Sequence, residues 1–393
     1  MSSSRRRSAT LAVASTGLLL AAAALPIALE LRVSRPTRPL DGAWRDIPVE
    51  PRGTTPLGIS FRPLQAEALG LDPLPTLERL LAYPFSILRL AAYWNRVEPR
   101  PGVLDTSELD RLLETAEAAG KQVVLGLGTV KNFGYPEFFV PQHRLPAPLP
   151  EGTLVSEQSH PDLLAAAEDV LRRLVDRYRA HPAIVAWQVE HEGVDPLGNE
   201  HSWRLAESFV RREVTVVRDS DPDRPVLLNG FLPTSQAVRV FQWWRTRDQG
   251  DSLDVAQRLA DVVGIDYYPR HAFAALGPLT AYLDARRSPL RPRRLSELLR
   301  WAARNDRRIW LAEGQAEPWE AITVPPDPQQ RAMASCGPAD VIRVYNDALR
   351  AARTAGVELG AYLFWGAEYW VRRDQGGDPS YLGAFSRLLA EAG

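Results

Sequence analysis

Three glutamates stand where apolar, strand-like runs end, and their carboxyl groups could do acid–base or nucleophilic chemistry. Glu190 and Glu192 lie on either side of His191 in the stretch IVAWQVEHEG, and Glu313 follows a second apolar run in WLAEGQAEPW. A carboxyl group can transfer protons as a general acid or base, and an ionised carboxylate can attack as a nucleophile. Whether these groups act together depends on the elements that carry them.

Short apolar runs of strand length alternate with longer helical patterns from residue 57 onwards. The eight candidate strands are 57–61, 86–90, 122–128, 184–190, 225–230, 261–268, 308–314 and 360–366. Apolar residues recur at helical spacing between them, and one such segment ends just before Pro182, where a helix is expected to end. The strands show no alternating polar face, which is typical of parallel strands buried on both sides.

Eight strand–helix units in about 340 residues predict an α/β fold, a (β/α)8 TIM barrel with enlarged loops. An open, doubly wound sheet is the competing architecture, but no GxGxxG follows the first strand. In a barrel, residues at the carboxyl ends of strands face the mouth, where active sites lie. Glu192 on the fourth strand and Glu313 on the seventh would then lie across the mouth from each other.

Two carboxyl groups that flank one bond are the requirement for retaining glycoside hydrolysis. One attacks the anomeric carbon, while the other protonates the leaving oxygen and later activates water. The sequence therefore predicts a retaining glycoside hydrolase that cleaves O-glycosidic bonds of an oligo- or polysaccharide by double displacement. A single strand-end glutamate is more often paired with an arginine, so this prediction depends on the pair.

Five motifs within residues 57–393 resemble the clan of (β/α)8 retaining glycoside hydrolases that includes cellulases, β-galactosidases and endo-galactanases. IVAWQVEHEG resembles the end of the clan's fourth strand, and WLAEGQAEPW resembles the end of its seventh. The resemblance implies that Glu192 is the acid/base and Glu313 the nucleophile. ILRLAAYWNRVEPRPGVLDTSELD, DVVGIDYYP and YLFWG resemble the second, sixth and eighth strands with their loops.

The same resemblance implies roles for the residues around the two glutamates. Arg89 would help to hold the nucleophile ionised, and Trp365 would stack under the sugar. Tyr268, or alternatively Tyr267, would contact the nucleophile. The clan has asparagine at the position of His191, and that asparagine donates a hydrogen bond to the sugar 2-hydroxyl. A histidine can also donate, but its ring is larger and its charge depends on pH.

This departure motivates an alternative function, a catalytically inactive barrel that binds carbohydrate. Glu190 is expected one layer deeper on the same strand face as Glu192, in a structural role with Arg89 or a hydroxyl as its partner. A slip of the strand register would exchange the roles of the two glutamates. Trp94 and Trp319 follow strand ends, so both are predicted to bind substrate at the mouth.

The composition argues against several other classes of function. The formal net charge is −1, which gives no electrostatic case for binding nucleic acid. Cys336 is the only cysteine, so neither an intrachain disulfide nor a cysteine metal cluster can form. A metal-dependent hydrolase would need histidines and acids clustered at strand ends, and none of the six histidines forms an HExxH motif. No metal and no cofactor are expected.

The N-terminal part predicts export. Three arginines at 5–7 precede an apolar run at 9–29, which is just long enough to span a membrane. The segment 1–29 is either a signal peptide, with Ala22 and Ala24 before the cleavage site, or a membrane anchor with the barrel outside. Residues 30–56 are rich in proline and arginine and read as an extended linker, and 57–393 as the catalytic domain.

Overall fold

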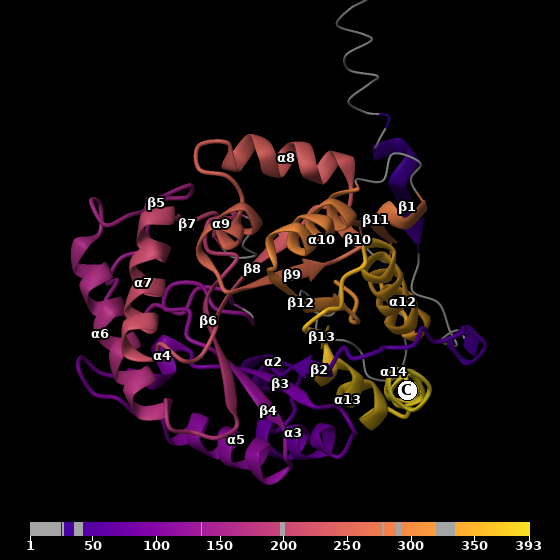
Figure 1. Cartoon of the computed structure of the whole chain (residues 1–393), viewed down its shortest axis with the longest axis horizontal. Coiled ribbons are helices and arrows are strands. Elements are labelled where there is room, and N and C mark those ends of the chain that lie inside the picture. The colour runs from indigo at the N-terminus through magenta and orange to yellow at the C-terminus, as the bar shows by residue number, and fades with distance from the viewer. Residues whose placement is uncertain are drawn as a thin grey trace, which may run out of the picture.

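A closed barrel of eight parallel strands forms the centre of the protein (Figure 1). The computed structural model describes residues 25, 27–34, 42–134, 136–196, 201–276, 279–287, 293–319 and 335–393. The barrel strands are β2 (Leu57–Ser60), β3 (Ile87–Ala91), β4 (Gln122–Gly126), β6 (Ile184–His191), β8 (Val226–Leu232), β9 (Val262–Tyr267), β12 (Arg308–Gln315) and β13 (Ala361–Trp365). They follow one another around the barrel in chain order, so the prediction of an eight-stranded α/β barrel is confirmed.

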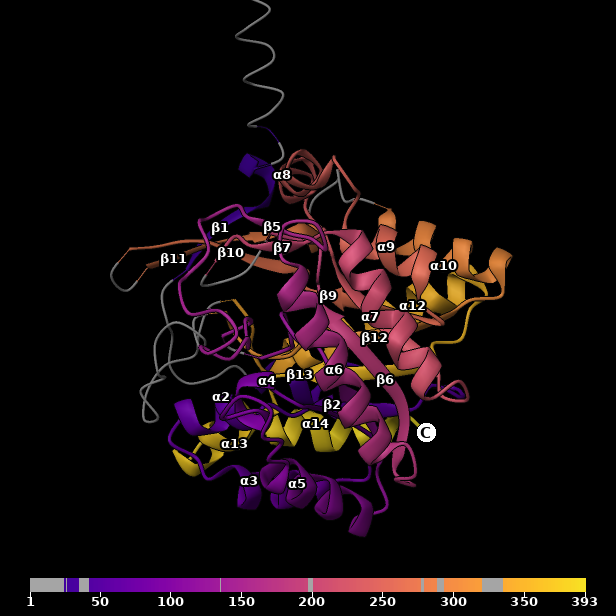
Figure 2. The same cartoon turned by 90° about the vertical axis from the view of Figure 1, so that its left-hand side faces the viewer.

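Helices surround the barrel on its outer side (Figures 1 and 2). They are α2 (Pro63–Ala68), α3 (Pro73–Leu81), α4 (Trp94–Val97), α5 (Ser107–Ala118), α6 (Pro161–Tyr178), α7 (Glu207–Ser220), α8 (Gln236–Thr246), α9 (Ser252–Leu259), α10 (Arg294–Asn305), α12 (Pro338–Ala355), α13 (Ala367–Gln375) and α14 (Ser380–Glu391), with 3-10 turns η1 (Gly42–Arg45) and η2 (Ala285–Arg287). The apolar faces of these helices, α8 excepted, and the outer faces of the strands form the main core.

The inside of the barrel is built in layers, because side chains of a strand alternate between its two faces. The lowest layer is an apolar cluster of Ile87, Val124, Ala186, Leu227, Val262, Trp310, Ala361 and Leu363. Two residues further along three of these strands stand the buried polar residues Arg89, Gln188 and Asn229. The mouth therefore begins with a polar layer that rests on an apolar floor.

In the part of the chain that the structure describes, five strands lie outside the barrel and were not predicted. β1 (Leu31–Ser34), β11 (Leu279–Asp284) and β10 (Arg270–Leu276) form an antiparallel sheet in that order, and β5 (Leu154–Val155) pairs with β7 (Arg204–Leu205). The hairpin of β10 and β11 is inserted directly after the sixth barrel strand, so it lies beside the mouth.

The predicted linker 30–56 contacts the folded body wherever the structure describes it. Its residues 31–34 pair with β11 as β1, and Trp44 is buried in the main core. The Glu50 carboxylate pairs with Arg350 and Arg353 of α12 at 2.8 and 2.9 Å. These contacts correct the interpretation of this segment as a free linker, while the domain limits stay a prediction.

The predicted signal peptide or anchor at 1–29 falls mostly outside the described residues, which omit 1–24 and 26. Within the described ranges, no helix combines the length and the apolar character that crossing a bilayer would need.

Trp94 corrects one predicted site residue. It opens α4, where its indole Nε1 donates to Glu98 at 2.6 Å, and only 1% of its surface is exposed. It belongs to the main core between strands and helices rather than to the mouth. A tryptophan after a strand end can turn outwards to pack under a helix, and the sequence does not distinguish this from a turn towards the mouth.

Candidate active site

Arg89 occupies the centre of the polar layer and organises the residues around it. It extends from β3 into the barrel and is 1% exposed. Its Nη1 donates to Glu313 Oε1 at 2.6 Å, and its Nε donates to Gln188 Oε1 at 2.6 Å. Because a guanidinium can only donate, these two contacts fix an acceptor at each partner.

Glu313 is held from two sides, by the two residues that the sequence predicts as its contacts. Arg89 pairs with its Oε1, and the hydroxyl of Tyr268 donates to its Oε2 at 2.5 Å. Burial raises the pKa of the Glu313 carboxyl, and Arg89 and Tyr268 oppose that rise. Burial and the charge of Glu313 raise the pKa of Tyr268 well above its usual value, so this hydroxyl remains a donor. The pKa of Glu313 stays raised, but these two contacts favour its ionised form relative to a buried carboxyl without them.

Glu192 lies in the opposite electrostatic environment. Its carboxyl is buried, and burial, followed by the charges of Asp266 and Asp195, raises its pKa well above the usual value. Asp266 is within hydrogen-bonding reach of Glu192, and its own pKa is also raised well above normal, by burial and by Glu313. Among the described residues, Asp266 Oδ1 has no hydrogen-bond donor. A proton shared between Asp266 and Glu192 would satisfy that oxygen and keep Glu192 in its acid form.

Asp266 connects the two predicted catalytic carboxyls. It stands next to Glu313 in the pairing of β9 with β12, and it reaches Glu192 on its other side. The Glu192 and Glu313 carboxyls therefore lie around one buried acid, with the fixed cation of Arg89 on the Glu313 side.

His191 points into the same network. Asn229 Nδ2 lies 2.8 Å from its Nδ1, and Arg89 Nη2 lies 3.4 Å from the same atom. Both neighbours donate, so Nδ1 accepts and the ring proton stands on Nε2. Burial and the positive charges of Arg89 and Lys131 hold the pKa of His191 well below its usual value. The ring is therefore a neutral donor, like the asparagine amide that it replaces.

Glu190 does not lie beneath Glu192 on the inner face, which corrects the predicted layering. Its carboxylate accepts the backbone N–H groups of Thr129, Val130 and Lys131 at 2.6–2.9 Å, and the hydroxyl of Thr129 at 3.1 Å. A hydroxyl partner is confirmed, whereas Arg89 is not a partner. Glu190 thus positions the loop after β4, in the structural role that the sequence predicted.

The reason for this outward turn is a break in the strand. Glu190 and Glu192 have φ values of 49° and 48°, in the left-handed region, and the pairing of β6 with β8 shifts between Gln188 and His191. A similar shift interrupts β12 between Leu311 and Glu313. Such irregularities re-aim side chains and are frequent next to active sites. The two strands that carry the predicted catalytic glutamates are both interrupted at those residues.

Aromatic rings line the rim above the carboxyls. They form one buried cluster of Tyr93, Phe133, Phe139, Phe231, Tyr268 and Trp365, against which Trp319 packs. The Trp319 ring lies 4.9 Å from that of Tyr268, and the Trp365 ring lies 4.2 Å from the guanidinium of Arg62. Trp319 and Trp365 are thus near the mouth, and their substrate-binding roles stay predictions.

The sequence prediction missed three polar residues of the network, Gln188, Asn229 and Asp266, as site residues. Gln188 Nε2 donates to Asn229 Oδ1 at 2.8 Å, and Asn229 Nδ2 donates to Asp266 Oδ2 at 2.5 Å. Each lies near the carboxyl end of an apolar strand, and Asn229 and Asp266 are the only polar residues on theirs. That feature is the signal that could have identified them, because polar residues on buried strands need hydrogen-bond partners.

Three residues of the network also offer donor atoms of the kind that bind metals. His191, Asp266 and Glu313 offer ligand atoms within 4.8 Å of one another. Both oxygens of Glu313 are engaged by Arg89 and Tyr268, and His191 Nδ1 faces two donors. A guanidinium already supplies the positive charge at this point, so the arrangement fits an ion pair better than a metal centre.

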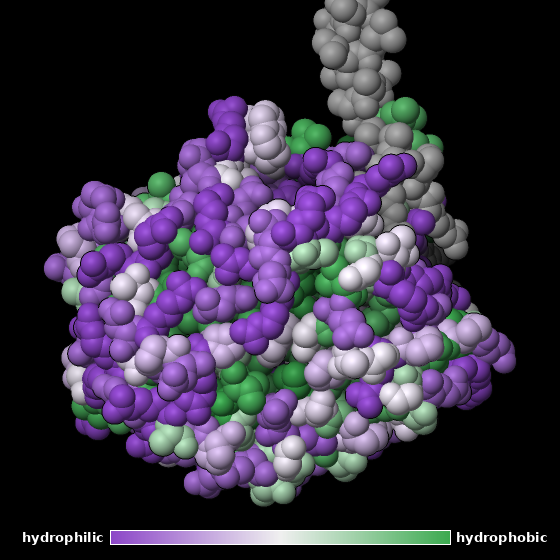
Figure 3. All heavy atoms as spheres, viewed as in Figure 1, coloured by the Kyte–Doolittle hydropathy of each residue, from purple (hydrophilic) through white to green (hydrophobic). Residues whose placement is uncertain are grey.

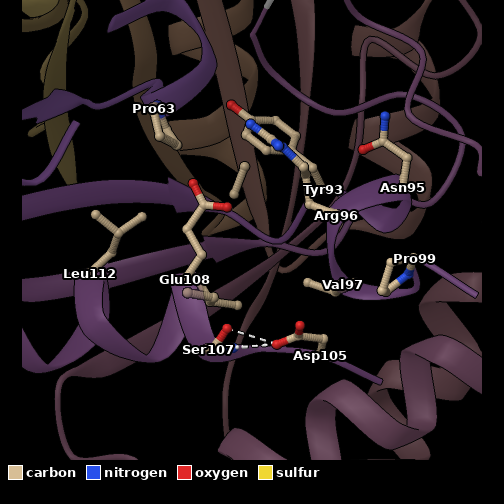
Figure 4. Close-up of a pocket in the computed structure, with 12 residues that line it drawn as sticks. Pro63, Tyr93, Asn95, Arg96, Val97, Pro99, Asp105, Ser107, Glu108 and Leu112 are labelled. Carbon is tan, nitrogen blue, oxygen red and sulfur yellow. Dashed lines mark hydrogen bonds between the residues drawn. The ribbon is translucent and has the colours of Figure 1, made fainter. Parts of the chain in front are cut away.

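A separate cavity of about 340 Å³ opens beside α4 and α5. Figure 4 shows Glu108 and Tyr93 around it, with Asp105 bonded to Ser107 at its lower edge. None of the three buried acids at the mouth lines this cavity, which shares Tyr93 with the aromatic rim of the site described above.

Comparison with known proteins agrees with the geometry. Residues 83–210 match the model of a beta-galactosidase family. The matched part includes Arg89 and Glu192. Beta-galactosidase BgaB of Geobacillus sp. (strain Y412MC61) is 29% identical over 107 residues, which are 25% of this chain and 16% of the relative. Over this stretch the protein is similar to beta-galactosidases. The aligned part spans less than a fifth of the length of the curated relatives that it matches.

Solved glycoside hydrolases share the fold of this protein. Exo-beta-1,4-mannosidase Op5Man5 from Opitutaceae bacterium strain TAV5 superposes with a TM-score of 0.51 at 17% identity, over 90% of this chain and 62% of the mannosidase. An endoxylanase retrieved from a sugarcane soil metagenome gives 0.51 at 17% identity, over 86% and 97%. At these identities the likeness establishes the barrel alone.

Removing the negative charge of Asp266 should change the pH profile of turnover. Asp266 raises the pKa of Glu192, so Asp266→Asn lowers it and the acid form is lost at lower pH. The alkaline limb of kcat/KM should therefore move to lower pH. Asp195→Asn, which removes a weaker contribution, should move the limb in the same direction but less. An alkaline limb that stays in place in a folded Asp266→Asn enzyme would contradict the shared proton.

Substitutions of His191 should separate its donor from its bulk. His191→Asn keeps a neutral donor and should retain turnover within about 10-fold. His191→Phe keeps a ring without the donor and should lose about 100-fold or more, mainly in kcat, because hydrogen bonds to the 2-hydroxyl strengthen in the transition state. Steady-state kinetics of both variants provide the measurement. Loss of turnover in His191→Asn with turnover retained in His191→Phe would mean that the ring itself, not its proton, is required.

Proposed function

We propose that the protein is a retaining glycoside hydrolase, with Glu313 as nucleophile and Glu192 as acid/base. The observation that carries the proposal is the unequal environment of the two carboxyls. Glu313 is in contact with the cation of Arg89, whereas the proton is retained where Glu192 meets Asp266. Two carboxyl groups whose surroundings separate their pKa values divide into a base or nucleophile and an acid.

In the first step, a Glu313 oxygen attacks the anomeric carbon while Glu192 gives its proton to the departing glycosidic oxygen. The bond between that carbon and the leaving oxygen breaks, and a glycosyl ester of Glu313 forms. Tyr268 and Arg89 steady the carboxylate until it becomes neutral in the ester. In the second step, Glu192 takes a proton from water, the water oxygen attacks the same carbon, and Glu313 is released.

The relatives and the rim support a choice of substrate class. The matched family and its Geobacillus members are described as beta-galactosidases, so β-galactosides are the first substrates to test. The aromatic rim with Trp319 and Trp365 suits the C–H faces of a sugar. The inactive carbohydrate-binding barrel has less support, because His191 is held as a neutral donor.

Turnover of a panel of activated aryl β-glycosides tests this proposal. Glu313→Gln should reduce hydrolysis to background, since the nucleophile is lost. Glu192→Gln should lose about 10²- to 10⁴-fold, most with poor leaving groups. Glu190→Gln is the matched control and should lose far less. The first product, followed by NMR, should keep the anomeric configuration of the substrate.

Two outcomes would overturn the assignment. Full activity in Glu192→Gln with loss in Glu190→Gln would exchange the two roles. Sugar binding by the wild-type protein without turnover of any glycoside would establish the inactive barrel.

We also propose that the barrel is exported, with 1–29 acting as a signal peptide or as an anchor. The support is the arginine cluster before the apolar run. Mass spectrometry of the protein isolated from its host should find one of two forms. A chain that begins at Leu25 and is recovered outside the membrane identifies a signal peptide, and an intact chain in the membrane fraction identifies an anchor. An intact chain in the soluble cell fraction would contradict export.

A further inference from the structure

Helix α8 has polar residues on its buried side and apolar residues on its exposed side. Its buried residues are Gln242 and Thr246, while Val240, Phe241, Trp243 and Trp244 are between 47% and 63% exposed. A surface helix normally turns its apolar stripe to the core and its polar side chains to water. The four exposed residues, hereafter the α8 apolar face, fall on one side of the helix because they lie three and four residues apart. Such a contiguous face marks a surface that binds something.

The polar residues on the buried side of α8 strengthen this contrast. Within the described structure, neither the nitrogen nor the oxygen of the Gln242 amide has a hydrogen-bond partner. Near the start of the helix, Val238 packs against the aromatic cluster of the barrel rim. The helix is therefore held beside the mouth by a small contact, with its most apolar residues directed away from the protein.

The charge around the α8 apolar face is positive. Arg239, Arg245 and Arg247 lie on or beside the helix, which contains no acidic residue between 236 and 247. The guanidinium of Arg245 lies 5.4 Å from the ring of Phe241, and that of Arg247 lies 5.8 Å from that of Trp244. The next acid, Asp248, is paired with Arg204 at 2.7 Å. Apolar and aromatic side chains edged by arginines are typical of helices that lie in the surface of an anionic membrane.

A second apolar feature stands on the same edge of the molecule. Figures 1 and 2 both show the N-terminal helical turn that precedes β1 side by side with α8. Leu25 and Val33, which flank this turn, are 51% and 62% exposed. Figure 3 shows pale and green side chains gathered along the edge over α8. The described end of the apolar run, at 27–29, thus lies next to α8.

We propose that the α8 apolar face inserts into the headgroup region of an anionic lipid bilayer and orients the barrel on that membrane. Tryptophan and phenylalanine rings settle at the level of the headgroups, and the arginines remain in contact with lipid phosphates. A second copy of this chain is a poorer occupant, because two such faces would bring six arginines together without acids. The binding is independent of hydrolysis, and it would place the barrel mouth close to the membrane surface.

A single fluorescent label on the full chain tests the insertion. The only native cysteine, Cys336, is fully buried, so Val240→Cys can be labelled selectively with an environment-sensitive nitrobenzoxadiazole dye. Val103→Cys, at a position 41% exposed in the loop between α4 and α5, is the matched control. The vesicles contain phosphatidylcholine alone or an equal mixture with phosphatidylglycerol. Turnover should be unchanged in both labelled proteins.

Insertion predicts a blue shift at position 240 with the anionic vesicles, quenching by shallow spin-labelled lipids, and no change at position 103. The shift should be smaller with phosphatidylcholine alone and should weaken in high salt. Adding Arg239→Gln, Arg245→Gln and Arg247→Gln to Val240→Cys should reduce it further.

Several results would overturn the proposal. One is a protein that binds the vesicles while the label at position 240 remains in water. A second is a protein that does not bind the vesicles. Another is a blue shift without vesicles, which would identify a different cover. If that shift rises with protein concentration the cover is a second copy, and if it does not, the cover is another part of the same chain.

Discussion

The buried contact between Arg89 and Glu313 is the interaction on which the rest of the site depends. A guanidinium inside a barrel loses its hydration, and the loss amounts to several kcal/mol unless acceptors replace the water. Glu313 and Gln188 supply those acceptors at 2.6 Å each. Because Arg89 can only donate, it sets the orientation of the Gln188 amide, whose Nε2 then donates to Asn229. Asn229 in turn donates to His191 and to Asp266.

This chain of hydrogen-bond donors influences which groups at the mouth carry a proton. One cation in direct contact with Glu313 faces three buried carboxyls, those of Glu192, Asp266 and Glu313. Burial disfavours every uncompensated negative charge, so the charge is retained beside Arg89 and a proton is retained between the other two. The division of labour that we propose between nucleophile and acid would therefore be a consequence of charge balance, present before any substrate arrives.

The sequence alone predicted most of the scaffold for physical reasons. Eight apolar runs of strand length located all eight barrel strands, because a strand buried on both faces must be apolar throughout. The same runs placed Arg89, Tyr268 and Glu313 at the ends of their strands, where the structure brings them together. The local order of residues was sufficient here, since each side chain needed only to be on the right strand at the right height.

What the sequence could not predict depends on contacts between strands. A register shift of one residue moves a side chain to the opposite face, and neither the shift on β6 nor that on β12 has a composition signature. Glu190 therefore turned to the loop at 129–131 instead of the barrel interior. Trp94 was misplaced for a related reason, because the turn after β3 decides whether its ring meets the mouth or the helices.

The strained stretch from Glu190 to Glu192 is stable because the loop after β4 surrounds it. Two non-glycine residues in the left-handed region destabilise the chain by roughly 1–3 kcal/mol each. Three backbone N–H groups converge on the Glu190 carboxylate, and Lys131 Nζ donates to the backbone oxygens of Glu192 and Asp195. These contacts compensate the strain and leave the Glu192 carboxyl aimed at Asp266 rather than at a backbone donor. A regular strand could not direct neighbouring residues in this way, so the irregular backbone is the structural condition for the buried position beside Asp266 that raises the pKa of Glu192.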